Sequence, residues 1–275
     1  MFSGVVVLYY PDFKMIRQII SYCKMFDYFY VIDNTPQKNE AVISSLVQLA
    51  NVIYIDNFVN MGVAYALNLA VEKCNDRGEK WLFLMDQDSY ISKESLQELY
   101  HFALTSSENN LAIVAGYYHD TYSARIEENI EVITSGSLVN VDICIHEGKF
   151  NEKLYIDEVD NEYCLRVIKD GYRIYRLNYV QFHHCLGHKK IYHNHVTYNY
   201  PPRRYYYLIR NALMVAEEYE EFFPELCAQK RMHVKKWIKM VRYEKQKLTK
   251  YLYILYGLID YKFKKTGVCP WKSYQ

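Results

Sequence analysis

The 275-residue sequence lacks the features that identify several common classes of protein. Its seven cysteines lie far apart and form no C-x-x-C pair, which argues against a zinc or disulfide framework and suits a reducing cytosol. No window reaches the ~18 uncharged apolar residues of a membrane-spanning helix, and the longest candidate, 251–259, is much shorter. The N-terminus leads directly into a strand-like segment instead of a signal peptide. We therefore expect a cytoplasmic protein that does not cross a membrane.

Charge is unevenly distributed, although the whole chain is nearly neutral at +1. Residues 229–275 contain thirteen Lys or Arg and two acids, so this end carries about +11 and the rest of the chain about −10. A basic end of this kind suits an anionic partner. We expect it to lie on an anionic membrane surface, with Trp237 and Trp271 as interfacial anchors. A helical cap with a solvated lysine face is the alternative.

The first half of the chain alternates strand and helix signals. Continuous apolar or β-branched runs predict strands at 4–10, 28–32, 52–55 and 80–85. Apolar residues at helical spacing predict helices at 12–26, 41–50 and 63–74. This alternation predicts an α/β fold with a mainly parallel central sheet flanked by helices. Ligands of such sheets bind outside the carboxyl ends of the strands, so residues that follow a strand are candidates for function.

The second half is mixed and then helical. Strands are expected at 111–117, 132–139 and 172–177, and a helix is expected at 160–169. From Arg203 onward the pattern is helical, with breaks at Pro224 and Pro270. We therefore expect a first domain at 1–202 and a helical, basic extension at 203–275.

Two acids placed two apart, Asp86 and Asp88, follow the apolar strand at 80–85. Crowded carboxylates repel one another unless a cation offsets them. A hard divalent ion such as Mg²⁺ or Mn²⁺ takes carboxylate together with phosphate oxygens. The same residues are consistent with an acidic helix start, in which Asp88 or Ser89 caps the segment from Ile91 onward.

Polar residues also follow the second and third strands. Asp33 can accept a hydrogen bond from a base or a ribose, or from its own backbone in a turn. Gly62 permits close approach of a ligand at a helix start, and Asn60 and Asn68 add polar groups around it. The same stretch can be interpreted as an Asn-capped helix without a ligand.

Four acids stand at the entrance of the helix expected at 160–169: Asp157, Glu158, Asp160 and Glu162. A dense acidic turn of this kind is commonly a solvated helix start. It can equally present one carboxylate as a general base that deprotonates a hydroxyl group. The sequence leaves both interpretations open.

Histidines and arginines complete the set of candidates. His184 lies in the run His183-His184-Cys185-Leu186-Gly187-His188 and can join carboxylates at a metal, or can simply line a polar loop. The isolated cysteine and the mixed spacing argue against zinc. Arg203, Arg204 and Arg210 stand among tyrosines and can bind phosphate. We expect no nucleic-acid partner, because most of the chain is acidic and carries no nucleic-acid-binding signature.

In their order and spacing, these segments resemble the family 2 glycosyltransferases of GT-A fold, and most closely the bacterial rhamnosyltransferase branch. The resemblance runs from Val5 to about Gly267. It rests on the segments VVVLYYP, VIDNT, NMGVAYALN, LMDQDS, TSGSLVNVD, LYIDEVDNEYCLR, HHCLG, RRYYYLIRN and YGLIDYKFKKTG. Each segment alone is a weak indication of the family. The order and spacing of all the segments together make the resemblance specific.

On the donor side, the resemblance implies that Asp33 reads the base of a nucleotide-diphosphate sugar. It implies that Asp86 and Asp88 hold Mg²⁺ or Mn²⁺ and the diphosphate, with Asp88 as the direct ligand and His184 close to both. The other positions that we assign to the donor are Asn60, Gly62, Asn68, Arg203, Arg204 and Arg210.

On the acceptor side, the resemblance implies that Asp160 is the catalytic base and that Glu162 is the acid that follows it. The segment Ser135-Gly136-Ser137 resembles the one that lines the acceptor. Two departures affect these assignments. Val159 precedes Asp160 where the family more often has Glu, and the additional acid Asp157 is a rival for the role of base. On the donor side, Thr35-Pro36 follows Asp33-Asn34 where Gly or Ser is usual.

The resemblance therefore implies an inverting, metal-dependent transfer of L-rhamnose from dTDP-L-rhamnose to a saccharide acceptor that is lipid-linked, in bacterial cell-surface polysaccharide synthesis. It also implies a peripheral position on the inner face of the cell membrane. A UDP-hexose or UDP-galactofuranose donor is the alternative, and we allow for a homodimer. A nucleotidyltransferase is less favoured because 8–14 lacks a Gly-rich basic loop. A non-catalytic saccharide-binding protein is less favoured because Asp86, Asp88 and Asp160 are all present.

Overall fold

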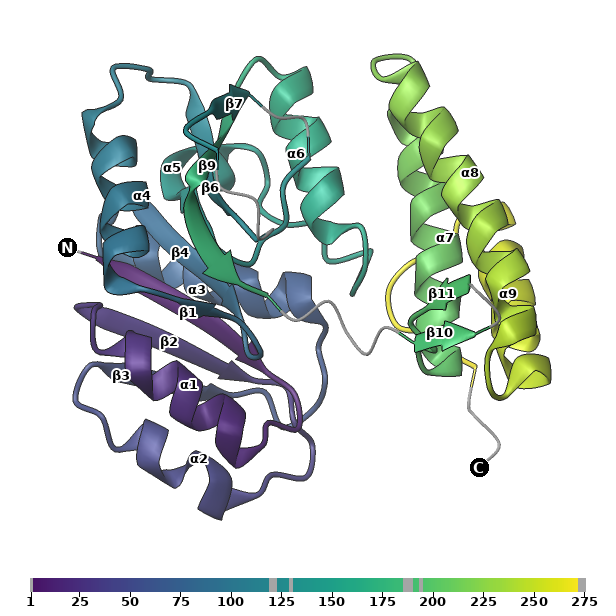
Figure 1. Cartoon of the computed structure of the whole chain (residues 1–275), viewed down its shortest axis with the longest axis horizontal. Helices are drawn as coiled ribbons and strands as arrows, with labels where there is room; N and C mark the ends of the chain where they lie inside the picture. The colour runs from purple at the N-terminus through teal and green to yellow at the C-terminus, as the bar shows by residue number, and fades with distance from the viewer. Residues whose placement is uncertain (1, 119–122, 129–130, 185–189, 193–194, 272–275) are drawn as a thin grey trace. The chain divides into compact units, whose positions relative to one another are not determined.

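The structure is a computed structural model of the chain, and it describes residues 2–118, 123–128, 131–184, 190–192 and 195–271 (Figure 1). The chain forms two compact units. Unit 1 comprises Met1–Asn151 and Tyr163–Cys185, and unit 2 comprises Glu152–Glu162 and Leu186–Gln275. Two segments that the sequence assigns to the first domain, 152–162 and 186–202, thus belong to the unit that contains the C-terminal helices.

Unit 1 is built on a sheet with nine described strands in the order β3-β2-β1-β4-β8-β6-β9-β5, and β7 also pairs with β9. The bounds are β1 Ser3–Leu8, β2 Tyr28–Asp33, β3 Val52–Asp56, β4 Trp81–Asp86, β5 Tyr90–Ile91, β6 Leu111–Tyr117, β7 Ile126–Glu128, β8 Ser137–Asn140 and β9 Arg173–His183. The first four strands predicted from the sequence, β1 to β4, are parallel. β8 runs antiparallel between β4 and β6. The expected α/β fold with a mainly parallel central sheet is confirmed.

Helices cover both faces of this sheet (Figure 1). Their bounds are α1 Phe13–Cys23, α2 Glu40–Val47, α3 Val63–Asp76, α4 Lys93–Thr105, α5 Val141–His146 and α6 Val159–Lys169. The apolar sides of α1, α2 and α4 form one core with alternate strand residues such as Val6, Val31 and Phe83. α3 packs on β1, β2 and β4 from the other face. The period of two along each strand therefore divides its side chains between two cores.

The second half of unit 1 departs from the predicted elements in two places. The expected strand at 132–139 begins only at Ser137, because Gly136 has a φ of +75° and a Cβ there would lie 2.5 Å from the ring of Phe182. The expected strand at 172–177 continues to His183. Both differences follow from the pairing of β6, β8 and β9, which are far apart in the sequence.

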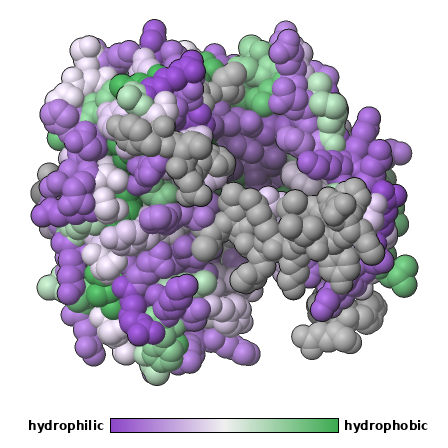
Figure 2. Space-filling model, viewed as in Figure 1, coloured by the Kyte–Doolittle hydropathy of each residue, from purple (hydrophilic) through white to green (hydrophobic). Residues whose placement is uncertain are grey.

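Unit 2 contains the helices α7 Pro202–Glu218, α8 Pro224–Met240 and α9 Lys247–Lys262, the short 3₁₀ helix η1 Val241–Tyr243, and a hairpin of β10 Lys190–Tyr192 with β11 His195–Thr197. The expected helical extension is confirmed. Pro202 and Pro224 stand in the first turns of their helices, where a missing N–H costs no hydrogen bond. Among the described residues, no helix combines the length and the apolar character needed to cross a bilayer. The surface visible over α8 is largely hydrophilic (Figure 2).

Candidate active site

The carboxyl ends of the parallel strands place three aspartates at one edge of the sheet. Asp33, Asp56 and Asp86 are the last residues of β2, β3 and β4. Asp33 lies beside Asp56 in the register, and β1 separates Asp33 from Asp86. Asp56 forms an ion pair with Lys38. This edge is where ligands bind in open sheets of this kind.

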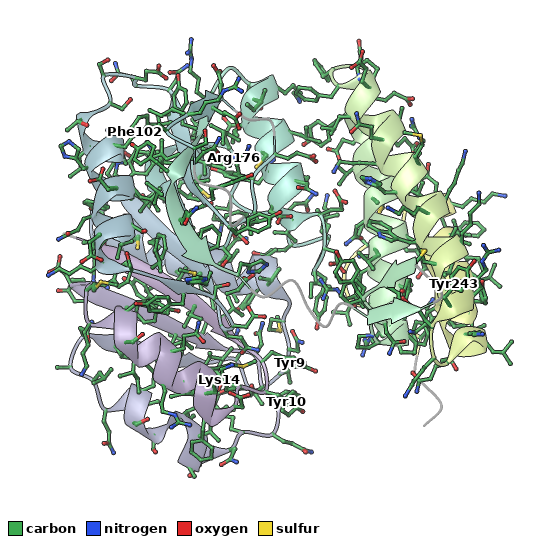
Figure 3. The ribbon with its side chains drawn as sticks, viewed as in Figure 1. Tyr9, Tyr10, Lys14, Phe102, Arg176 and Tyr243 are labelled. Carbon is green, nitrogen blue, oxygen red and sulfur yellow. The ribbon has the colours of Figure 1, made fainter. Side chains whose placement is uncertain are left out.

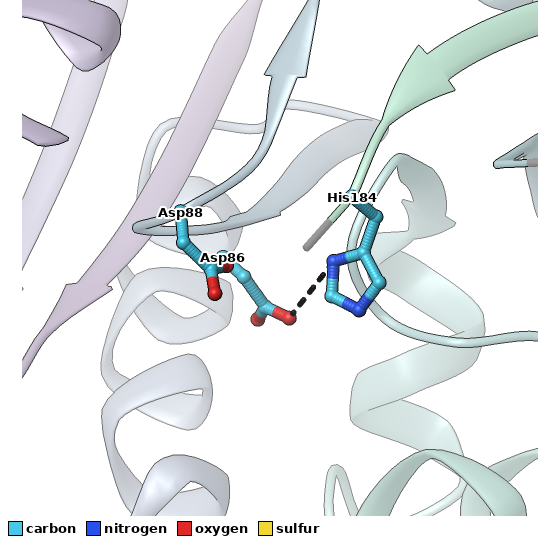
Figure 4. Close-up of side chains that lie close together, drawn as sticks. All are labelled: Asp86, Asp88 and His184. Carbon is cyan, nitrogen blue, oxygen red and sulfur yellow. Dashed lines mark ion pairs between the residues drawn. The ribbon is translucent and has the colours of Figure 1, made fainter. Parts of the chain in front are cut away.

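Asp86, Asp88 and His184 gather at this edge (Figure 4). Asp88 lies two residues beyond the end of β4, and His184 directly follows β9. One carboxylate oxygen of each aspartate and a ring nitrogen of His184 lie within 4.8 Å of one another. His184 Nδ1 is 3.8 Å from Asp86 Oδ2. The three residues that the resemblance assigns to the metal are therefore close together.

A chain of serine hydroxyl groups braces this cluster. Ser135 Oγ accepts a hydrogen bond from the backbone N–H of Asp86 (3.1 Å) and donates one to Ser89 Oγ (3.0 Å). Ser89 Oγ in turn lies 2.8 Å from His184 Nδ1. A histidine whose Nδ1 is hydrogen-bonded in this way can present Nε2 to a cation, and such a partner fixes the orientation of the ring.

The electrostatics of the cluster favour a cation. Burial lowers the pKa of His184, although the charge of Asp88 opposes this shift. The shift disfavours the charged form of the imidazole ring beside the two aspartates, of which Asp86 is 46% exposed. Carboxylate oxygens with an imidazole nitrogen suit Mn²⁺, and carboxylate oxygens also suit Mg²⁺. The donor set thus fits the predicted divalent ion.

The alternative in which Asp88 or Ser89 caps a helix is wrong. The following helix, α4, begins at Lys93, and its N-cap is Ser92, whose Oγ accepts a hydrogen bond from the backbone N–H of Ser95 at 3.1 Å. Because Ser92 supplies the cap, capping does not account for the acids before it.

Asp33 borders a cavity of about 240 Å³ between the end of β2 and the start of α2. Its Oδ1 accepts the N–H of Thr35 (2.8 Å), and its Oδ2 accepts the hydroxyl of Tyr54 (2.7 Å). Asp33 therefore bonds the backbone of its own turn and also borders a pocket, so both interpretations considered from the sequence describe part of its surroundings. Tyr10, which follows β1, also lines this cavity, and its ring lies beside that of Tyr9 (Figure 3). A contact of Asp33 with a base stays a prediction.

The loop before α3 is held from the end of β2. Asn34 Nδ2 donates to the carbonyl oxygen of Gly62 (3.0 Å), and Asn60 Oδ1 accepts the N–H of Gly62 (2.9 Å). Gly62 is the N-cap of α3 and has a φ of +88°, which favours glycine. The Asn-capped helix considered from the sequence is thus replaced by a glycine cap, and Asn60 shapes the loop before it.

Asn68 has a structural role. It is buried in α3, and its side-chain amide bonds both backbone groups of Phe150, accepting from the N–H and donating to the carbonyl oxygen at 2.9 Å each. These bonds join α3 to the segment after α5. They account for the amide group without a ligand, so we leave Asn68 out of the donor site.

The segment Ser135-Gly136-Ser137 is buried at the sheet. Ser135 braces the Asp86 cluster, and Ser137 Oγ donates to the carbonyl oxygen of Ile133 at 2.7 Å. The backbone N–H of Gly136 donates to the carbonyl oxygen of Leu84. Their surroundings give these residues a supporting role at the carboxyl edge of the sheet, and a contact with the acceptor stays a prediction.

The second acidic cluster belongs to unit 2, and three of its four acids have partners in α7, directly after α7, or in α8. Arg204 donates to Asp157 Oδ1 from Nη2 at 3.0 Å. Tyr219 donates its hydroxyl hydrogen to Glu162 at 2.9 Å. A buried ion pair joins Lys230 to Glu158 at 2.8 Å. The helical extension is therefore the frame that holds the acidic segment.

The backbone of this segment is strained and firmly held. Tyr155, Asp157 and Glu158 all have φ between +61° and +69°, in the left-handed region that side chains avoid. Asn211 Nδ2 donates to the carbonyl oxygens of residues 154, 156 and 157 at 2.7–3.1 Å. Arg210 is fully buried, and Nη2 donates to the carbonyl oxygens of residues 153 and 154. These bonds give Arg210 a structural role instead of the phosphate contact expected for it.

Asp160 lies in the first turn of α6, and its Oδ1 accepts the N–H of Asn161 at 2.9 Å. Its rival Asp157 differs in environment. Burial raises the pKa of Asp157 against the opposing effect of Arg204, and Oδ2 of Asp157 is buried without a hydrogen-bond donor among the described residues. Asp157 is thus enclosed by protein, whereas Asp160 is half-buried at the helix entrance.

The remaining predicted positions are partly occupied or not described. Arg203 donates to the carbonyl oxygen of Cys269 at 2.8 Å, and Arg204 also lies over the ring of Tyr200. Phosphate contacts of these two arginines stay predictions. In the histidine run, Cys185, Leu186, Gly187 and His188 lie outside the described residues.

Sequence reasoning missed several residues that support these sites. Gln87, between the two aspartates, bonds both backbone groups of Tyr9 with its side-chain amide, at 2.9 and 3.1 Å. Further examples are Ser89, which is hydrogen-bonded to His184, and Lys230, which pairs with Glu158. Gln87 and Ser89 could have been suspected from their place beside Asp88. Nothing in the sequence links Lys230 to a segment more than seventy residues earlier.

The chain matches the family model described as Glycosyl transferase family 2 over residues 5–196. Among curated proteins, it is similar to the dTDP-rhamnosyl transferase RfbF of Shigella flexneri. The two are 27% identical over 239 residues, which cover 77% of this chain and 78% of that protein.

Three solved structures share the fold. S. aureus TarS has a TM-score of 0.60 at 14% identity, covering 94% of this chain and 48% of that chain. TarS 1–349 in complex with UDP-GlcNAc has a TM-score of 0.57 at 15% identity, covering 95% and 80%. GalNAc-T7 with UDP, GalNAc and Mn²⁺ has a TM-score of 0.56 at 10% identity, covering 66% and 43%. This chain thus spans less than half the length of GalNAc-T7 and of the longer TarS chain.

The fold is the GT-A fold of the glycosyltransferases. Because the family model covers well over half of the sequence, the chain belongs to glycosyl transferase family 2 and is a transferase.

Proposed function

We propose that this chain transfers L-rhamnose from dTDP-L-rhamnose to a hydroxyl group of a saccharide acceptor, with inversion at the anomeric carbon. The observation that carries the proposal is the cluster of Asp86, Asp88 and His184 at the ligand-binding edge of a family 2 chain. The similarity to a dTDP-rhamnosyl transferase over most of the chain supports this choice of donor.

Asp88, with Asp86 and His184, would hold a divalent ion against the two phosphates of the donor. When bound, Mg²⁺ or Mn²⁺ supplies Lewis-acid stabilisation of the charge that develops on the leaving diphosphate. The hydrogen bonds of Ser135 and Ser89 keep the backbone of Asp86 and the ring of His184 in place. A site held in this way needs little reorganisation during the reaction.

Asp160 would act on the acceptor. Its carboxylate takes the proton of the acceptor hydroxyl group while the oxygen forms a bond to the anomeric carbon and the bond to the diphosphate breaks. General-base catalysis of this kind contributes about 10²–10⁴-fold to a rate. The contacts from α7 and α8 to residues 153–162 supply the fixed position that a base requires.

Asp33 and the cavity beside it would receive the base of the nucleotide. The cavity is bordered by the exposed ring of Tyr10, and aromatic rings stack on nucleotide bases. The amide of Asn39 and the side chain of Gln37 also line it and offer donors and acceptors for a pyrimidine. The donor-side role of Gly62 is to let the backbone approach the diphosphate.

We propose that the acceptor is a lipid-linked saccharide and that the protein works in the cytoplasm at the inner face of the membrane. The basic segment 229–275 supports this location. A UDP-hexose or UDP-galactofuranose donor is the second candidate. It is favoured by the fold shared with proteins whose structures contain UDP-GlcNAc or UDP.

A donor panel tests the proposal. The melting temperature of the protein is measured with dTDP-L-rhamnose, UDP-hexoses and UDP-galactofuranose, each with and without Mn²⁺. We expect dTDP-L-rhamnose with Mn²⁺ to give the largest rise and the Asp88→Asn variant to lose it. Asp142→Asn, which changes an exposed acid on α5, is the matched control and should keep the rise. A larger shift with a UDP-sugar would select the second candidate, and binding without turnover would favour a non-catalytic saccharide-binding protein.

A further inference from the structure

The helix α9 departs from the usual arrangement of a water-soluble helix, because it buries two charged residues and exposes several large apolar ones. Its inward side carries Lys250 and Asp260, which are completely buried, together with Tyr253 and Ile254. Lys250 donates to Glu244 at 2.6 Å. Water-soluble helices normally bury an apolar side and expose a charged one.

The outward side of α9 is apolar. Leu248, Leu252 and Leu255 follow one another at spacings of four and three residues, so they lie on one stripe of the helix. Leu248 is 86% exposed and Leu255 is 51% exposed. Tyr251 and Leu258 flank the stripe and are also exposed. We call these five residues the leucine stripe. A contiguous exposed stripe of large apolar residues marks an interaction surface.

The charged side chains that this part of the chain exposes are of one sign, and one of them, Lys264, forms an ion pair with the partly exposed Glu217 of α7. Within the described residues from 245 to 271, every exposed charged side chain is a lysine, and the single acid, Asp260, is buried. The lysines stand at both ends of the stripe: Lys245, Lys247, Lys262, Lys264 and Lys265. An apolar stripe between lysines suits an interface that is apolar inside and anionic at its surface.

We propose that the leucine stripe of α9 is a membrane-docking surface, which lies in the plane of an anionic lipid layer with its lysines at the headgroups. This inference rests on the membrane location proposed above and specifies the surface that would produce it. The residues of the leucine stripe are not the membrane anchors expected from the sequence, which are Trp237 and Trp271. The ring of Trp271 stacks on Tyr256 at 4.2 Å, and its N–H donates to Asp260, while Trp237 packs against the core of unit 2.

A second copy of the chain is a less suitable occupant. A two-fold contact uses the same patch on both copies. Two antiparallel α9 helices would therefore bring the lysines at one end of the stripe against those at the other end of its partner. Like charges placed together at a contact disfavour it, whereas anionic lipid offsets them.

Vesicle flotation of the full-length protein tests this proposal, with phosphatidylcholine vesicles that contain or lack phosphatidylglycerol. We expect the wild type to float with the anionic vesicles, and we expect Leu255→Glu to weaken this binding by about tenfold or more. Leu104→Glu makes the same change at an exposed leucine of α4 and should bind as the wild type does. Lys245→Ala with Lys247→Ala should weaken the binding to anionic vesicles and make it less sensitive to salt.

Two results would overturn the proposal. One is undiminished vesicle binding by Leu255→Glu and, independently, by Leu252→Glu. The other is a wild type that sediments as a dimer and becomes a monomer in Leu255→Glu while vesicle binding stays the same, which would assign the stripe to a second copy. The assay needs neither donor nor acceptor, so its failure would leave the proposed transfer reaction standing.

Discussion

The acids at the end of β4 and the acids at 157–162 have very different surroundings. Asp86 and Asp88 lie close to His184, and together these residues offer oxygen and nitrogen ligands that suit a divalent ion. Asp157, Glu158 and Glu162 instead have partners in the C-terminal part of the chain, which are Arg204, Lys230 and Tyr219. In the proposed function, the first cluster binds the divalent ion and the donor, whereas the second holds one carboxylate in a fixed place. Each prediction below tests one side of this contrast.

The largest effect is expected at the second cluster, in the Asp160→Asn variant. Loss of the general base should reduce the rate of transfer at saturating donor by about a thousandfold. The melting temperature should change little, because Asp160 is half-buried at the surface end of α6. Asp170→Asn, at an exposed residue directly after the same helix, is the matched control. A rate within a few-fold of the wild type would transfer the role of base to another residue, with Asp157 as the first candidate.

The next effect concerns the frame of the second cluster. Lys230→Met removes the partner of Glu158, and both side chains are more than nine-tenths buried. An uncompensated buried charge should lower the free energy of unfolding by about 3 kcal/mol, as measured by chemical denaturation. Lys235→Met, at an exposed position of α8, should cost little. The double variant Lys230→Met with Glu158→Gln should recover part of the loss, and a single variant as stable as the wild type would show that the pair does not hold the segment.

A smaller effect is expected at the first cluster, in the Asp88→Asn variant. Outer-shell partners alone can be worth ~10–100-fold in metal affinity, so loss of a direct ligand should weaken Mn²⁺-dependent donor binding by about a hundredfold. Binding of the donor without Mn²⁺ should stay as in the wild type. A titration of donor with and without the ion measures both. If the variant keeps the full effect of Mn²⁺, the ion binds elsewhere.

The smallest effect concerns pH and Asp157. Burial raises the pKa of this carboxyl group above its ordinary value of 3.8. Between the unfolded and the folded pKa, the folded state binds more protons than the unfolded state, so stability falls as pH rises through this window. Asp157→Asn removes this dependence. Its stability relative to the wild type should therefore rise with pH above about 3.8 and then level off. A difference that is constant with pH would contradict the raised pKa.

The sequence predicts the first half of unit 1 well, because local patterns specify it. The runs at 4–10, 28–32 and 80–85 are apolar enough to require a buried strand, and each corresponds to a strand of the parallel sheet. The polar residues that end these runs could be placed at one edge by the handedness of the connections alone. The sequence alone therefore places Asp86 and Asp88 at the ligand-binding edge of the sheet.

The parts that the sequence did not predict depend on contacts between distant segments. The length of β9 is set by its pairing with β5 and β7, and the start of β8 by the ring of Phe182 against Gly136. Arg210 carried the signature of a phosphate ligand, yet its donors meet backbone carbonyl groups of residues 153 and 154. Only the fold shows which acceptors a guanidinium group meets.

The most direct test of the central claim is to measure donor binding and transfer separately in the Asp88→Asn and Asp160→Asn variants. The two substitutions should impair different steps of the reaction. With Mn²⁺ present, calorimetric titration should show Asp160→Asn binding the donor with the affinity of the wild type while it transfers almost nothing. Asp88→Asn should instead bind the donor about a hundredfold more weakly. Two results would contradict the assignment of donor binding to Asp88 and of catalysis to Asp160. One is a donor affinity that falls equally in both variants, and the other is an Asp160→Asn protein that still transfers sugar.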